Sequence, residues 1–123
     1  MVPMSIVAIR GAITIDKNDS DSILDGTKEL IYEVEKRNNI DKNKVISIIF
    51  SSTKDLDAEY PAKAARELGY TNCALMCFNE MHVVNSLNKC IRVLILCENE
   101  NQQDNIKHVY LKNAKVLRPD LDE

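Results

Sequence analysis

The sequence is poor in the residues from which several familiar catalytic motifs are built. It has no tryptophan, two phenylalanines and only three glycines among 123 residues. So few glycines leave little room for a loop whose backbone amides cradle a phosphate, and neither a Gly-x-Ser-x-Gly nor a His-Glu-x-x-His pattern occurs. Any catalytic activity of the chain must therefore work without these common phosphate, nucleophile or zinc motifs.

Long apolar runs and blocks of like charge are also missing. No run approaches the ~20 apolar residues that a membrane-spanning helix needs, and the Met-Val-Pro start lacks the charged and apolar regions of a signal peptide. A net charge of -3 argues against a nucleic-acid-binding protein that works by overall positive charge. We therefore expect a cytoplasmic protein that binds neither membrane nor nucleic acid.

Cysteine is present, but not in a pattern that binds metal or forms a disulfide framework. The four cysteines, at positions 73, 77, 90 and 97, lie in apolar stretches typical of strands, and none of their spacings matches the short knuckle of a structural zinc site. The two histidines lie far apart in the sequence. We expect reduced thiols and no bound metal.

The chain has enough apolar residues, 45% of the total, for the core of one globular domain over residues 1–123. Apolar stretches predict four strands and a final extended segment, at Ile6–Ile15, Val45–Ser52, Cys73–Phe78, Lys89–Cys97 and Val109–Leu117.

Two helices are predicted between the first three strands. Apolar residues recur at helical spacing over 23–34, after a polar cluster at 19–22 that can supply an N-cap oxygen, and the run ends at Asn38 and Asn39. Pro61 suits the first turn of a shorter helix, which Gly69 closes. This order predicts an α+β fold, a mixed sheet with its helices on one face, and leaves the other face for a second subunit to cover.

Two arginines interrupt the apolar strands. Arg10 lies within SIVAIRGAITI and Arg92 within KCIRVLIL. A guanidinium that loses its water needs acceptors, so two of them indicate a shared anionic ligand. The alternative, a structural ion pair or an arginine that caps backbone carbonyls, stays open.

Other polar residues are weaker candidates for a site. CFNEMH places Cys77 and Glu80 at the end of a predicted strand, where side chains commonly project into a cleft. A solvated loop glutamate and a core cysteine are the simpler interpretations. Lys63 and Arg66 share one face of the short helix and Arg118 follows the last segment, but such charges are by default only solvated.

Six longer motifs occur along the chain: AIRGAIT, YPAKAARELG, CFNEM, KCIRV, HVYL and VLRPDL. Together, in this order and spacing, they resemble the small monofunctional chorismate mutases of the AroH class, over nearly the whole chain. The resemblance implies a homotrimer whose sheets face inward as a pseudo-α/β-barrel, with active sites at the subunit interfaces. The implied reaction is the Claisen rearrangement of chorismate to prephenate, leading to phenylalanine and tyrosine, without a cofactor.

The resemblance also implies roles for single residues. Arg10 and Tyr110 match residues that meet a substrate carboxylate, and Cys77 and Glu80 match a pair near the ring hydroxyl. Arg92 matches the arginine of KCIRV, and we expect it to donate hydrogen bonds to the ether oxygen of the breaking bond.

The remaining matched residues are expected to contact substrate from the rim of the site. Lys63, Arg66 and Arg118 match basic residues around its mouth. Tyr60 stands where the family usually has a phenylalanine, and Leu117, in VLRPDL, is expected among the substrate-binding residues.

A second function is a trimeric carboxylate-binding or regulatory protein that uses the same interfacial arginines without turnover. Glu80 distinguishes the two. A site that only holds a dianion gains little from a carboxylate, whereas a site that orients a ring hydroxyl can use one as an acceptor.

Overall fold

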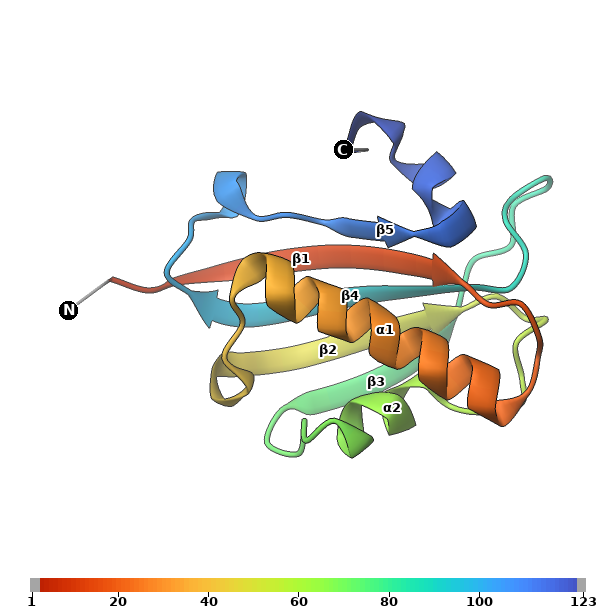
Figure 1. The fold of residues 1–123 in the computed structure, drawn as a ribbon, viewed down its shortest axis with the longest axis horizontal. Coiled ribbons are helices and arrows are strands. Elements are labelled where there is room, and N and C mark those ends of the chain that lie inside the picture. The colour runs from red at the N-terminus through yellow and green to blue at the C-terminus, as the bar shows by residue number, and fades with distance from the viewer. Residues whose placement is uncertain (1–2, 122–123) are drawn as a thin grey trace.

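The structure is a computed structural model that describes residues 3–121; residues 1–2 and 122–123 of the predicted domain lie outside the described part. It contains a five-stranded mixed sheet with helices α1 (Ser20–Asn38) and α2 (Pro61–Glu67) on one face, as Figure 1 shows. The predicted α+β fold is therefore confirmed. Across the sheet the strands are β3 (Ala74–Asn79), β2 (Val45–Ser52), β4 (Cys90–Asn99), β1 (Ser5–Thr14) and β5 (Val109–Leu111).

The middle of the sheet is antiparallel and its two edges are parallel. Strand β4 pairs antiparallel with both β1 and β2, whereas β5 lies parallel to β1 and β3 lies parallel to β2. Alternate residues of the central strands form the core under the helices: Val7, Ile9, Ile13, Ile48, Phe50, Ile91, Val93 and Ile95. The residues between them point to the other face, because successive side chains on a strand alternate.

Both helices begin and end where the sequence predicts. Asp19 accepts a hydrogen bond from the Ser22 amide at 2.7 Å as the N-cap of α1, and Asn39 closes this helix in the left-handed conformation, at φ 51°. Pro61 opens α2, and Gly69, at φ 97°, follows its end. The buried side of α1 packs against the sheet core.

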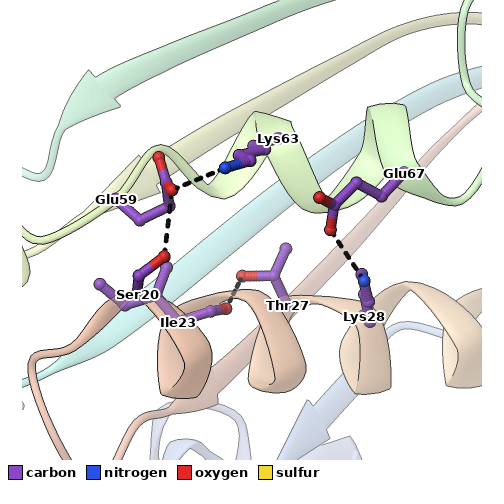
Figure 2. Close-up of polar contacts among 7 residues, drawn as sticks. All are labelled: Ser20, Ile23, Thr27, Lys28, Glu59, Lys63 and Glu67. Carbon is purple, nitrogen blue, oxygen red and sulfur yellow. Dashed lines mark hydrogen bonds and ion pairs between the residues drawn. The ribbon is translucent and has the colours of Figure 1, made fainter.

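Polar contacts tie the short helix α2 to α1, as Figure 2 shows. Lys28 Nζ lies 2.9 Å from Glu67 Oε1. Ser20 Oγ donates to Glu59 Oε1 at 3.1 Å, and the same carboxylate oxygen lies 3.2 Å from Lys63 Nζ. Exposed ion pairs of this kind contribute little individually, but together they fix the orientation of α2, which carries predicted site residues.

The sequence predicts an extended segment over Val109–Leu117, and this prediction is wrong beyond Leu111. The chain continues as a 3-10 helix, Lys112–Leu117, whose first residue takes a left-handed φ of 54°. The reason lies in the neighbouring strand, because β1 ends at Thr14, one residue beyond the partner of Leu111, and cannot pair with a segment that runs to Leu117. The Asn113 amide donates instead to the Thr14 side-chain oxygen at 3.2 Å, which fixes the turn.

The sheet face opposite the helices, here called the open face, is apolar and uncovered in the single chain. Ile6, Met76 and Phe78 are 65%, 58% and 52% exposed on it, and Leu94 and Leu96 are half-buried. Monomeric proteins rarely expose so many neighbouring apolar side chains. The open face therefore has the character of an interface.

The described residues can be searched for disulfides, for groups of metal-binding side chains and for helices that could span a membrane. All four cysteines are free, and Cys90 and Cys97 are buried. Within residues 3–121, no three histidine, cysteine or acidic side chains gather as metal ligands would. In the same range, no helix combines the length and apolar character needed to cross a membrane.

Replacing Gly11 by alanine should destabilise the chain, because a side chain there has no room. A Cβ would lie 2.9 Å from the backbone oxygen of Val109 and 3.1 and 3.2 Å from the side chains of Leu30 and Val93. Strand β5 would have to move away from β1, at a cost of about 1–3 kcal/mol. Thermal unfolding followed by circular dichroism should show a lower midpoint. An unchanged midpoint would show that β5 can move away from β1 without a loss of stability.

Candidate active site

Three predicted site residues meet in a hollow on the open face. The hollow has a volume of about 230 Å³ and lies where β2, β4, β1 and β5 run side by side. Arg10 comes from β1, Arg92 from β4 and Tyr110 from β5. The hollow's remaining lining is Gly11, Ile49, Ser51, Val93 and Leu94. The hollow thus brings two cations, a phenol and the Ser51 hydroxyl together with apolar side chains, a set of groups that can bind an anion.

Arg92 has a carboxylate partner within the chain. Its Nε atom lies 3.3 Å from Oε1 of Glu80, the residue that follows β3. The contact is close enough for an ion pair, but Nε is buried and makes no aligned hydrogen bond. The whole side chain is 42% exposed. The ion-pair interpretation therefore holds for Nε, while much of the guanidinium is still open to a ligand.

Glu80 is itself held by the neighbouring strand. Ser51 Oγ donates to Glu80 Oε1 at 2.5 Å, and the Glu80 amide donates to the Ser52 carbonyl at 2.9 Å. The side chain of Glu80 is 24% exposed. Its second oxygen, Oε2, has no hydrogen-bond partner among the described residues and can accept from a ligand.

Arg10 is exposed, and its guanidinium forms no ion pair with any residue from 3 to 121. Its backbone amide donates to His108 Nδ1 at 3.0 Å. Burial lowers the pKa of His108, and the charges of Arg10 and Arg118 lower this pKa further. His108 is therefore neutral at neutral pH, the form in which a ring nitrogen can accept this hydrogen bond.

Arg118 and Leu117 lie on the same side of the sheet as Tyr110. Both Leu117 and Tyr110 pack against a small buried cluster that includes Ala114. Arg118 forms two hydrogen bonds to the Asp120 carboxylate, at 3.1 and 2.9 Å. These bonds raise the pKa of Arg118, with a smaller contribution from Tyr110, which places this cation close to the phenol.

The other predicted residues form a second group at the β3 edge of the sheet. Tyr60, Arg66 and Cys77 line a hollow of about 370 Å³, and Tyr60 and Cys77 also line an adjoining hollow of about 560 Å³. Tyr60 is 69% exposed. Lys63, which belongs to α2, forms an ion pair with Glu59 (Figure 2). Cys77 is half-buried and packs against the core, so the simpler interpretation of this cysteine is correct in part.

The structure thus separates residues that the sequence treats as one site. Cys77 and Glu80 are three residues apart, but Cys77 points to the helix side of β3 whereas Glu80 reaches Arg92 on the open face. The β3 edge and the β5 edge are at opposite ends of the strand order. One chain therefore carries the predicted residues in two separate groups, and neither group contains all of them.

Residues 6–121 match the family model described as chorismate mutase type I. The chain belongs to this family. The resemblance inferred from the six sequence motifs is therefore confirmed.

Individual type I chorismate mutases are similar over almost their full length. Chorismate mutase AroH of Bacillus subtilis (strain 168) is 42% identical over 119 residues, which cover 96% of this chain and 94% of the relative. Chorismate mutase AroH of Thermus thermophilus is 39% identical over 115 residues, with coverages of 93% and 94%. A chorismate mutase structure from Clostridium thermocellum superposes with a TM-score of 0.87 at 50% identity, covering 89% of this chain and 97% of that one.

The sequence analysis missed two residues that touch the site. Ser51 bonds to Glu80, and His108 bonds to the backbone of Arg10. Both contacts join residues of different elements, so no local pattern announces them. Only the parallel pairing of β2 with β3 and the passage of residue 108 along β1 could have indicated them.

Acidification should weaken the contact between His108 and β1. Because the pKa of His108 is below its ordinary value of 6.5 in the folded chain, the unfolded chain binds the proton more readily. Stability from this residue should therefore be present above that value and fall as the pH drops below it. The drop in unfolding midpoint between about pH 7.5 and about pH 5.5 should be smaller for His108→Gln, which keeps an acceptor that does not titrate.

His82 provides the control for this experiment, because it is exposed and lies in the loop after β3. His82→Gln should keep the pH dependence of the unmodified chain. If His108→Gln and His82→Gln both lose the pH dependence of the unfolding midpoint to the same extent, His108 is not the source of that dependence.

Proposed function

We propose that this chain converts chorismate to prephenate at sites formed between neighbouring copies of a homotrimer. Membership of the type I family makes the chain a chorismate mutase, which is an isomerase. The observation that carries the proposal for the site is the hollow where Arg10, Arg92 and Tyr110 meet beside Glu80. The non-catalytic carboxylate-binding alternative is not favoured, since the family model and the similar relatives are all chorismate mutases.

The reaction is a unimolecular rearrangement, so the protein has no covalent bond of its own to make. It can lower the barrier by holding the reactive chair-like conformer and by placing positive charge where the breaking C–O bond develops negative charge. Neither task needs a nucleophile or a proton-transfer group. This agrees with a sequence in which the common nucleophile motifs are missing.

Arg92 is the residue that we assign to the ether oxygen. A strand inside a sheet holds its side chain more rigidly than a loop, and electrostatic catalysis depends on such preorganisation. The contact with Glu80 is made through Nε, and we assign the outer nitrogens of the guanidinium as the donors to the substrate. Their fixed fork can span the ether oxygen and a carboxylate together.

The substrate carboxylates would be bound by the cations around Arg92. Arg10, which forms no ion pair within residues 3–121, lines the hollow together with Tyr110. Arg118 can add a second charge, although Asp120 shares it. Leu117 would supply an apolar contact at the same edge. The Oε2 atom of Glu80 would accept a hydrogen bond from the ring hydroxyl.

A neighbouring copy would supply the second group of residues. None of these residues lines the hollow that holds Arg92 in their own chain: Tyr60, Lys63, Arg66 and Cys77. Two observations support association: the uncovered apolar character of the open face, and the separation of the predicted residues into two groups on one chain. A homotrimer satisfies both by placing the β3 edge of one copy over the hollow of the next.

Prephenate formed by this chain would serve phenylalanine and tyrosine biosynthesis. The cytoplasmic location expected from the sequence stays a prediction.

Arg92→Lys should be severely impaired although it keeps the charge, because an ammonium cannot reproduce the guanidinium fork. We expect kcat to fall by about 10²–10³, and Arg92→Ala to be at least as poor. The measurement is the loss of chorismate ultraviolet absorbance above the spontaneous rate, with circular dichroism to check folding. Arg37→Ala, on the outer side of α1, is the control and should keep full activity. Near-normal kcat in Arg92→Ala, or its unfolding, would make Arg92 a structural residue.

Mixed oligomers can test whether each site draws on two chains. Arg92→Ala and a Tyr60→Ala, Arg66→Ala double variant should each be poor enzymes alone. When they are co-expressed with different tags, about one site in four would combine two intact halves and recover activity. Co-expression of Arg92→Ala with Arg10→Ala, two changes in the same half, should recover none. Equal results for the two pairs would place the whole site in one chain.

A further inference from the structure

Ser51 lies directly beside the arginine that the proposed function places at the reacting bond. In the antiparallel ladder of β2 and β4, Ser51 is the register partner of Arg92. Both side chains face the open side of the sheet, and both line the hollow that contains Arg10 and Tyr110. The position of Ser51 is fixed by the strand, so its hydroxyl is a rigid reference point.

One carboxylate oxygen connects Ser51 to Arg92. Glu80 Oε1 accepts the hydrogen bond from Ser51 Oγ at 2.5 Å and lies 3.3 Å from Arg92 Nε. Glu80 follows the end of β3, where its backbone is tied to β2 through the bond from its amide to the Ser52 carbonyl. A glutamate side chain at such a place has several rotamers to lose, and a hydroxyl on a neighbouring strand can select one of them.

The environment of Arg92 Nε explains why the rotamer of Glu80 matters. Nε is buried, has no aligned hydrogen bond, and has Glu80 Oε1 as its nearby carboxylate. If Glu80 swung away, a charged donor would be left buried and unpaired, which is strongly unfavourable. The guanidinium would then move to find water, and its outer nitrogens would leave the position that the reaction requires.

We propose that Ser51 is a positioning residue, whose hydroxyl holds the Glu80 carboxylate in the rotamer that keeps Arg92 in place. This proposal rests on the proposed function for its catalytic consequence. Ser51 donates its only proton to Glu80, so it acts through Glu80 and not on the substrate directly. Because the Ser51 and Arg92 contacts both use Oε1, the same arrangement leaves Oε2 free to face a substrate hydroxyl.

Kinetics of Ser51→Ala give the first test. We expect kcat to fall by about 5- to 30-fold with KM little changed, because a misplaced donor weakens transition-state contacts more than binding. Ser51→Thr, which keeps the hydroxyl on a residue suited to strands, should restore most of kcat. Ser47→Ala is the matched control, since Ser47 lies on the same face of β2 and lines none of the hollows around the site.

A double-mutant cycle separates positioning from a purely structural role. In a Glu80→Ala background, Ser51→Ala should cause no further loss of kcat, because the group that it positions is already gone. If the two losses multiply, or if Ser51→Ala keeps full kcat, the proposal is overturned. A lower unfolding midpoint that accounts for the whole loss of activity would also overturn it.

A readout that does not need turnover keeps this proposal distinct from the proposed function. The Arg92 Nε–H resonance should be observable by NMR, and Ser51→Ala should broaden it or speed its exchange with water, whereas Ser47→Ala should not. If the unmodified chain failed to consume chorismate, the proposed function would fall, and this resonance would still decide whether Ser51 positions Arg92. If Ser51→Ala changed neither the line width nor the water exchange of the Arg92 Nε–H resonance, the positioning role would be refuted even in an active enzyme.

Discussion

The alternation of side chains along β4 is the constraint on which the site depends. Ile91, Val93 and Ile95 are buried under the helices, so Arg92, between the first two, must face away from the core. Under the helices its guanidinium would need several buried acceptors; on the open face Glu80 lies beside Nε and the side chain is 42% exposed. The packing that builds the core therefore also delivers the cation to the hollow, and neither can change its register without the other.

The open face links association to electrostatics in the proposed trimer. In the single chain, water reaches Arg10 and part of Arg92, and it weakens their attraction for an anion. A neighbouring copy that covers Ile6, Met76 and Phe78 would also exclude water from the adjacent hollow. Apolar side chains and cations on one surface are then complementary: the first drive association, and the second become effective through it.

Local patterns predicted the parts of this chain that depend on local physics. Helical spacing and caps were sufficient for α1 and α2, and apolar stretches were sufficient for the strands that carry Arg10 and Arg92. The prediction that Lys112–Leu117 is extended was wrong, because the conformation of this segment depends on where another strand ends. The contact of Ser51 with Glu80 joins two strands, and its prediction would have required the parallel pairing of β2 with β3. Sequence spacing alone cannot supply such pairings.

The shortness of β5 has a thermodynamic consequence for the ligand. Only three residues pair this strand with β1, although it carries Tyr110 and leads to Leu117 and Arg118. Few backbone hydrogen bonds must break to open this edge, so it belongs to the least stable part of the sheet, whereas Arg92 sits in its most stable part. A substrate that bridges Arg10 and Tyr110 must therefore supply the free energy that orders this edge. The observed association constant is then the intrinsic constant of the closed site multiplied by the fraction of time for which the edge is closed.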